Sequence, residues 1–252
     1  MSNSRKEPRS RIRIASYNLW WHKAYHEVAE IVDGQQLDII CLQECYPSDL
    51  KKSVQGLRLA GSHAYVHRLP LIHRQSKKTA TTSAWKNAGM AIYYNPRQLE
   101  LISLERFALP LPWQERNGGR IFQVAHFKVL ATGKLIVVAN IHLSALLAPS
   151  RARRKQLQEI LQGVTAQGDT LPVILAGDFN YPLVARSLHT LMEAEGFTEC
   201  GAHVSMPTHM SRVIKGKFDR IFISEDVEEQ GYAILPFGLS DHAPITATLG
   251  FA

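Results

Sequence analysis

The sequence predicts a single α/β domain with its helices on the outside of packed β-sheets. About ten short segments of strand character alternate with three or four segments of helical periodicity, and no linker or internal repeat divides them. The composition, 45% hydrophobic and 20% charged, is that of a globular protein with a full core, and excludes a disordered tail, a collagen and a coiled coil. We therefore expect a basic tail over residues 1–10 and one domain over residues 11–252.

The predicted strands are of two kinds. Some alternate polar and apolar residues, as half-buried strands do, and others are continuous apolar runs of strand length, typical of strands buried on both faces. The turn at residues 131–133 predicts a hairpin between two of them. The predicted strands are residues 11–20, 37–44, 89–94, 99–107, 120–129, 134–143, 171–180, 217–224, 231–237 and 243–250.

Helical segments lie between these strands. Residues 24–32, 48–57 and 184–195 predict helices, and another begins at Ser150. This last helix has an apolar face at the spacing of an amphipathic helix. The residues on that face are Leu157, Ile160, Leu161 and Val164. Residues 74–88 are polar without apolar periodicity, and they predict a long mobile loop.

The positive charge of the chain is concentrated in one stretch. The net charge is +7, yet no Asp or Glu occurs between Leu50 and Leu99. A stretch of this kind is either a solvated loop or a surface that binds a polyanion such as a phosphate backbone. Its basic residues are Lys51, Lys52, Arg58, Arg68, Arg74, Lys77, Lys78, Lys86 and Arg97.

The chain is expected to be soluble, cytoplasmic and monomeric. No apolar run approaches the roughly 20 residues that span a bilayer, and no hydrophobic stretch follows the basic N-terminus before the first strand. The three cysteines, Cys41, Cys45 and Cys200, are odd in number and lack metal-ligand spacing. They fit buried thiols in a reducing compartment better than a disulfide framework.

Polar side chains that could act in catalysis or bind a metal ion lie at the ends of the apolar strands. Each one alone is more simply a helix cap or a turn residue. Four strands that end in this way predict a shared cleft, because strand ends on one edge of a sheet meet in space. An oxygen-rich set with few imidazoles and no cysteine suits Mg²⁺, or Mn²⁺, better than zinc. The strand-end residues are Asn18, Glu44, Asp178, Asn180, Asp241 and His242, joined by His142 and Asp219.

The motifs around these residues, NLW, LQE, NIHL, GDFN, FDRIF and SDHAP, resemble the endonuclease/exonuclease/phosphatase superfamily. Its members include deoxyribonuclease I, abasic endonucleases of the exonuclease III type, tyrosyl-DNA phosphodiesterases, sphingomyelinases and inositol polyphosphate phosphatases. The resemblance runs from Ile12 to Leu249 in family order. It implies a four-layer α/β/β/α sandwich of two mixed β-sheets flanked by helices.

The resemblance also implies roles for these residues. Glu44 resembles the principal Mg²⁺ ligand, with Asn18 and Asp241 near the ion or its water shell. Asp178 resembles the residue that orients and deprotonates the attacking water, and Asn180 would hold that water or a phosphate oxygen.

Two histidines complete the set that the resemblance implies. His242 resembles the histidine that contacts the scissile phosphate, and Asp219 would orient its ring. His142 lies where members carry a His or Tyr that touches the phosphate or the leaving group, although a satisfied core histidine is nearly as plausible. Thr208 and His209 resemble the family's Thr before the FDRIF strand, and a plain turn explains them equally well.

Several cations are candidates for contact with phosphate. Arg151 and Arg154 lie in the first turns of a predicted helix, where cations oppose the helix dipole, and a bound anion or simple solvation would offset this cost. Lys77 and Lys78 lie in the predicted basic loop.

One departure from the deoxyribonuclease I pattern is expected. Members of that branch pair the histidine at the His142 position with a Glu from the segment after LQE, and no acid is present there. Exonuclease III-type enzymes usually carry Tyr at that position, so abasic-site incision is not favoured either.

These observations favour a Mg²⁺-dependent phosphodiesterase that acts on nucleic acid, with DNA as the expected partner, as an endonuclease or exonuclease. A phosphatase, a sphingomyelinase-like lipid phosphodiesterase and a tyrosyl-DNA phosphodiesterase could use the same core. A catalytically silent binding module is the rival of a different class. The intact motifs speak against it.

Overall fold

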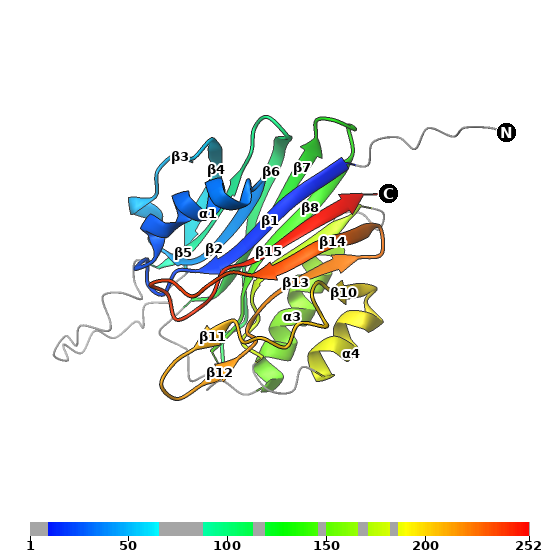
Figure 1. Ribbon diagram of the computed structural model, residues 1–252. Coiled ribbons are helices and arrows are strands. Elements are labelled where there is room, and N and C mark those ends of the chain that lie inside the picture. Colours follow the sequence, from blue (N-terminus) through cyan, green and yellow to red (C-terminus); the bar gives the residue numbers. More distant parts are fainter. Residues whose placement is uncertain are drawn as a thin grey trace, which may run out of the picture.

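The protein is a sandwich of two β-sheets with helices on both outer faces (Figure 1). The computed structural model describes residues 10–65, 88–112, 119–145, 150–165, 171–181 and 186–251. Both large sheets are mixed, because β1 and β2 pair in parallel in one sheet and β8 and β9 pair in parallel in the other. The four-layer α/β/β/α fold expected from the sequence is confirmed.

The first sheet has seven strands, and β1 lies near its middle between β15 and β2. Its strands, in spatial order, are β14 (Val227–Ile234), β15 (Ile245–Phe251), β1 (Ser10–Asn18), β2 (Ile39–Cys45), β5 (Gly89–Tyr94), β4 (Leu57–Ala64) and β3 (Ser53–Val54).

The second sheet has six strands, and a separate two-stranded hairpin follows the segment after β10. The strands of the second sheet, in spatial order, are β10 (Phe197–Glu199), β13 (Asp219–Ser224), β9 (Val173–Asp178), β8 (Leu135–His142), β7 (Ile121–Val129) and β6 (Leu99–Ala108). The hairpin consists of β11 (His209–Met210) and β12 (Lys215–Gly216).

The helices cover the two outer faces. Helix α1 (Val28–Gln35), preceded by a 3₁₀ turn at Tyr25–Glu27, packs on the first sheet. Helices α3 (Ser150–Thr165) and α4 (Arg186–Ala194) pack on the second sheet (Figure 1). The predicted apolar face of α3 is confirmed, since Leu157, Ile160, Leu161 and Val164 are all buried.

The main core lies between the two sheets and contains Ile14, Ile92, Phe127 and Ile174. A buried polar network also crosses this interface. Gln43 Nε2 donates to Asn140 Oδ1 at 2.8 Å, and Asn140 Nδ2 reaches Leu42 O at 3.1 Å and Gln123 Oε1 at 3.0 Å. These bonds are directional, so they hold the two sheets in one register beside the strand ends that bear Glu44 and His142.

Two predicted elements are wrong. The helix predicted over 48–57 is replaced by a 3₁₀ turn at Pro47–Asp49 and the hairpin of β3 and β4, which turns at Gln55 and Gly56 with φ of 46° and 82°. Two consecutive residues of positive φ form the tight turn that a β-hairpin favours. The last-but-one strand lies at Val227–Ile234 rather than 231–237, because it pairs along β15 through a bulge between Glu229 and Gly231.

Other predictions differ in detail or fall outside the described residues. The strand predicted to end at Trp20 ends at Asn18. The short strands β3, β10, β11 and β12 and the strand β4 were not predicted. All of the predicted mobile loop at 74–88 except Ala88, and the tail before Ser10, lie outside the described residues. Among the residues that the structure describes, we find no helix with the length and apolar composition of a membrane span.

Candidate active site

The predicted strand-end residues meet at one edge of the sandwich. In the second sheet, register places His142 of β8 beside Asp178 of β9, and Asp178 beside Asp219 of β13. In the first sheet, Asn18 at the end of β1 lies next to the end of β2, which carries Glu44. The two sheets are joined here, because Asn18 Nδ2 donates to Asp178 Oδ2 at 3.1 Å.

His242 is held by a buried carboxylate. Its Nδ1 lies 2.8 Å from Asp219 Oδ2, and its Nε2 lies 3.8 Å from Asp178 Oδ2. Burial alone would lower the pKa of His242, but the charge and hydrogen bond of Asp219, with Asp178 and Asp241, raise it to about 10. His242 is therefore an imidazolium at neutral pH, with Nε2 directed at the carboxylates of the site.

Asp178 occupies the centre of the cluster. It is 2% exposed, and its Oδ1 accepts the backbone N–H of Asn180 at 2.9 Å. Burial raises its pKa to about 6, against the opposing effect of the His242 charge. A side chain at the preceding Gly177 would place its Cβ 1.9 Å from Ile141 O, so only glycine allows β8 and β9 this close an approach.

Asn180 turns the chain away from β9. It adopts a left-handed backbone with φ of 53°, a conformation that Asn tolerates better than most residues. Its Nδ2 donates to Leu143 O at 3.1 Å. This bond ties the turn to the residue that follows His142.

Glu44 is presented by an irregularity in β2. Its φ is 53°, and the pairing of β2 with β5 shifts register between Gln43 and Cys45. A bulge of this kind re-aims a side chain, and a left-handed non-glycine residue is strained by about 1–2 kcal/mol. Burial raises the pKa of Glu44 to about 7, although the charges of Arg120 and His242 act in the opposite direction.

The loop after β1 holds both Asn18 and Glu44. Trp20, Trp21 and His22 all have positive φ, between 46° and 67°. In this strained turn, Trp20 N–H donates to Asn18 Oδ1 and Trp21 N–H donates to Glu44 Oε2, each at 3.1 Å. Backbone strain near functional groups is a recurrent feature of active sites.

His142 has a hydrogen-bond partner that the sequence did not predict. Its Nδ1 lies 2.6 Å from the Tyr65 hydroxyl, and its Nε2 lies 3.6 Å from Asp178 Oδ2 and 3.9 Å from Glu44 Oε1. The Arg120 guanidinium lies over the Tyr65 ring, 5.5 Å from its centroid. Burial, together with the charges of Arg120 and His242, lowers the pKa of His142 well below its usual range.

Tyr65 and Arg120 have no distinctive sequence signal. Tyr65 follows β4 in the basic stretch, and Arg120 precedes β7. Both are 2% exposed. The sequence shows only that Arg120 directly precedes the apolar residues of β7, and its burial is known from the structure alone.

Asp241 and His209 lie next to His242. Asp241 Oδ2 lies 3.6 Å from His209 Nε2, and its Oδ1 lies 4.0 Å from His242 Nε2. Thr208 acts as a structural clamp, because its Oγ1 accepts the backbone N–H groups of Phe218 and Asp219, each at 2.9 Å.

The donor set suits a hard divalent cation. Asp178, Asp219 and His242 offer ligand atoms within 4.8 Å of one another, as do His209, Asp241 and His242. Asp219 Oδ1 and Asp241 Oδ1 are buried and have no hydrogen-bond partner among the described residues. Together the two groups offer three carboxylates and two imidazoles, and carboxylate oxygens are the ligands that hard divalent cations prefer.

Glu44 lies outside both of these compact groups of possible ligands. It remains electrostatically coupled to Asp178, Asp241 and His242. Its carboxylate therefore faces the same region from the first sheet.

The cations predicted to contact phosphate do not belong to the cluster of strand-end residues. Arg151 and Arg154 are exposed on the first turns of α3, and the charge of Arg154 acts on Tyr181, which follows Asn180. The buried cation of this helix is Arg153, which donates to Ala145 O at 3.0 Å and lies 5.1 Å from the Tyr181 ring centroid. Lys77 and Lys78 lie outside the described residues.

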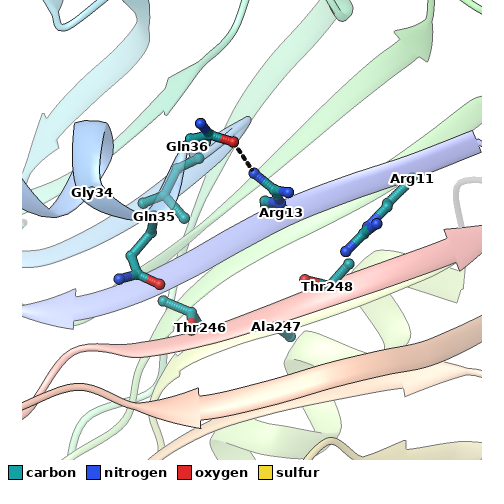
Figure 2. Close-up of a pocket in the computed structure, with 9 residues that line it drawn as sticks. Arg11, Arg13, Gly34, Gln35, Gln36, Thr246, Ala247 and Thr248 are labelled. Atoms are coloured by element: carbon teal, nitrogen blue, oxygen red, sulfur yellow. Dashed lines mark hydrogen bonds between the residues drawn. The ribbon is translucent and has the colours of Figure 1, made fainter.

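A separate pocket of about 350 Å³ lies on the outer face of the first sheet (Figure 2). Its lining includes Arg11, Arg13 and Thr248, and Arg13 Nη1 donates to Gln36 Oε1 at 2.6 Å. Arg13 precedes Asn18 by five residues on β1, a separation of roughly 16 Å along a strand. The pocket is therefore distinct from the candidate active site.

The fold and site define a hydrolase of phosphate esters. Residues 15–242 match the Endonuclease/Exonuclease/phosphatase family, and the chain belongs to that family. Its members are phosphodiesterases or phosphatases that generally depend on a divalent metal ion.

One curated relative is protein angel of Drosophila melanogaster, which is 30% identical over 149 residues. The match covers 57% of this chain and 39% of that protein, so the chain spans well under half of the relative's length.

Two solved structures share the fold over nearly the whole chain. A family member from Bacteroides thetaiotaomicron has a TM-score of 0.75 at 20% identity, with 98% of this chain and 100% of that chain covered. ANGEL2, a 2′,3′-cyclic phosphatase solved with adenosine-2′,3′-vanadate, has a TM-score of 0.74 at 14% identity, with 96% of each chain covered.

Proposed function

We propose that this protein is a Mg²⁺-dependent phosphodiesterase that hydrolyses phosphodiester bonds in nucleic acid, with DNA as the first substrate to test. The observation that carries the proposal is the convergence of Asn18, Glu44, Asp178 and His242 from both sheets on one edge. Hydrolysis of a phosphodiester needs an oriented nucleophile, a cation on the phosphoryl oxygens, and donors for the charge of the transition state.

Asp178 is suited to the general base. Its Oδ1 and Oδ2 are oriented by the Asn180 N–H and the Asn18 amide, so the carboxylate is held in one position. A pKa of about 6 leaves it ionised yet basic enough to accept a proton from water near neutral pH.

His242 and His142 are suited to meet the charge on the phosphate. His242 is an imidazolium held by Asp219, and its Nε2 lies 3.8 Å from Asp178 Oδ2. A phosphoryl oxygen near these atoms would lie beside a fixed positive charge. The attraction between the two is strongest in a site shielded from water.

Glu44, Asp241 and Asn18 would hold the Mg²⁺ ion, or Mn²⁺ in its place. The ion would polarise the phosphoryl oxygen and stabilise the developing charge on the leaving group. The raised pKa of Glu44 supports this assignment, because a buried carboxylate without a cation beside it takes up a proton more readily.

Nucleic acid as the substrate is supported by the charge of the chain. The net charge is +7, and nine basic residues without any acid lie between Leu50 and Leu99. Contacts of such residues with phosphates give affinity with little sequence preference.

The test is a cleavage assay on supercoiled plasmid and on end-labelled DNA and RNA oligonucleotides, with Mg²⁺ and with chelator. Asp178→Asn should lower turnover by about 10²–10⁴-fold, the usual effect of losing a general base, and retain nucleic-acid binding. Asp226→Asn, at an exposed turn, is the matched control and should leave turnover unchanged. Equal turnover in Asp178→Asn and wild type would exclude Asp178 from the mechanism.

A panel of other esters separates the rival substrates. A 5′-tyrosyl oligonucleotide, sphingomyelin vesicles and sugar or inositol phosphates should be cleaved more slowly than DNA or RNA. Faster metal-dependent cleavage of any of them would assign the protein to that substrate class instead.

A further inference from the structure

The hydrogen bond between Tyr65 and His142 has a direction that the surrounding groups determine. The Tyr65 hydroxyl has two hydrogen-bond contacts among the described residues, with Glu44 N at 3.3 Å and with His142 Nδ1 at 2.6 Å. The backbone N–H of Glu44 can only donate, so the hydroxyl oxygen accepts this bond. The hydroxyl proton then has one acceptor within the described residues, His142 Nδ1.

The opposite assignment would leave a buried proton without a partner. If His142 Nδ1 carried the proton, the Tyr65 oxygen would accept two N–H groups and its own O–H would lack an acceptor among the described residues. Tyr65 and His142 are each 2% exposed. An unsatisfied buried donor is costly, so this arrangement is disfavoured.

We propose that Tyr65 is a positioning residue that holds His142 as a neutral imidazole with its proton on Nε2, so that His142 serves as a fixed hydrogen-bond donor to the substrate phosphate. Nε2 is the nitrogen on the catalytic side, 3.6 Å from Asp178 Oδ2 and 3.9 Å from Glu44 Oε1. These separations exceed a hydrogen bond, so the Nε2–H is not committed to either carboxylate.

The role of His142 follows from the chemistry of its partner. A carboxylate partner accepts the Nδ1 proton and stabilises an imidazolium, which can transfer a proton, whereas a tyrosine hydroxyl donates to Nδ1 and favours the neutral ring. His142 would therefore present a hydrogen-bond donor, Nε2–H, to the substrate phosphate. The two histidines of the site differ in the partner of Nδ1, which is the Asp219 carboxylate for His242 and the Tyr65 hydroxyl for His142.

This inference rests on the proposed phosphodiesterase function for the role of His142, but the tautomer can be tested without any substrate. The protein is labelled with ¹⁵N-histidine, and the ring nitrogens of His142 are assigned by comparison with His142→Ala. In the metal-free wild type we expect an unprotonated Nδ1 and a protonated Nε2. A protonated Nδ1 would overturn the inference.

Tyr65→Phe tests the positioning role. This variant keeps the ring and removes the hydroxyl, so the His142 signals should move toward a mixture of the two tautomers. Tyr93→Phe is the matched control, because Tyr93 is also buried and its hydroxyl donates to Lys51 O at 2.6 Å, outside the site. Tyr93→Phe should leave the His142 signals unchanged.

Turnover provides the second measurement. Tyr65→Phe should lower kcat by about tenfold, the usual effect of one hydrogen bond, and should cause no further loss when added to His142→Ala. Additive losses, or a change in Tyr65→Phe no larger than in Tyr93→Phe, would overturn the positioning role.

The tests of the proposed function and of the His142 tautomer can be interpreted independently. If no phosphate ester is hydrolysed, the proposed function fails while the ring signals still decide the tautomer. If Tyr65→Phe does not fold, the wild-type signals alone decide it.

Discussion

Replacing Glu44 by Gln is expected to stabilise the metal-free protein and to abolish its response to Mg²⁺. Glu44 has a pKa of about 7 in the folded chain against an ordinary value of 4.5. Between these two pH values the folded state binds more protons than the unfolded state, so the free energy of unfolding falls as the pH rises. The difference corresponds to about 3 kcal/mol of destabilisation once Glu44 is ionised in both states.

The neutral isostere removes this cost and retains the local hydrogen bond. The Gln side-chain oxygen can still accept the Trp21 N–H that Glu44 Oε2 accepts at 3.1 Å. At pH 8 we expect Glu44→Gln to raise the free energy of unfolding by up to about 3 kcal/mol, or Tm by about 6–12 °C. Below pH 4.5 the difference should vanish, because Glu44 is then protonated in both states.

Thermal and urea denaturation from pH 4 to pH 8.5, with and without Mg²⁺, measures both effects. Mg²⁺ at about 100 times its Kd should stabilise the wild type by about 2.7 kcal/mol and should not stabilise Glu44→Gln. Glu100→Gln, at an exposed position on β6, is the control and should change stability by no more than about 0.5 kcal/mol. A metal-free Glu44→Gln protein less stable than wild type at pH 8 would refute the reasoning.

Three further outcomes are expected. Asn140→Ala should lower the free energy of unfolding by about 3–5 kcal/mol in urea denaturation, because it removes the buried amide that bonds Gln43 Nε2, Leu42 O and Gln123 Oε1; a loss below about 1 kcal/mol would contradict this. Asp219→Asn should lower the pKa of His242 from about 10, since it removes the negative charge that pairs with the ring, and a ring titration by NMR that stays near 10 would count against the pairing. DNA binding, followed by fluorescence anisotropy, should weaken about 10³-fold between about 50 and 200 mM NaCl if at least about six phosphates are contacted; a salt-independent affinity would argue against phosphate contacts.

Much of the site could be predicted from the sequence because its residues terminate apolar strands. A continuous apolar run that ends in Asp marks a strand whose end reaches an edge of the sheet, and Asp178 is the last residue of β9. Asn18 and His142 are the last residues of β1 and β8, although both of these strands were predicted to extend further. The apolar spacing of α3 likewise predicted its buried face. These signals are local, since strand and helix periodicity depend on neighbours within a few residues.

The hairpin of β3 and β4 shows where local signals fail. Val54 and Leu57 are three residues apart, so in the sequence they resemble part of one helical face. The positive φ of Gln55 and Gly56, which forms the turn between them, is known only from the structure. The tertiary contacts of β4 with β5 decide between the two conformations.

The sequence alone determined which residue types could bind a cation and a phosphate, and that no acid could serve as the partner of His142 from the segment between Leu50 and Leu99. Only the tertiary structure decided that Tyr65 from that segment takes the place beside Nδ1, with Arg120 over its ring. Contacts across 77 residues of chain depend on strand register and on the packing of one sheet against the other. Neither is encoded in any short pattern, so the protonation state of the site follows from the fold rather than from its motifs.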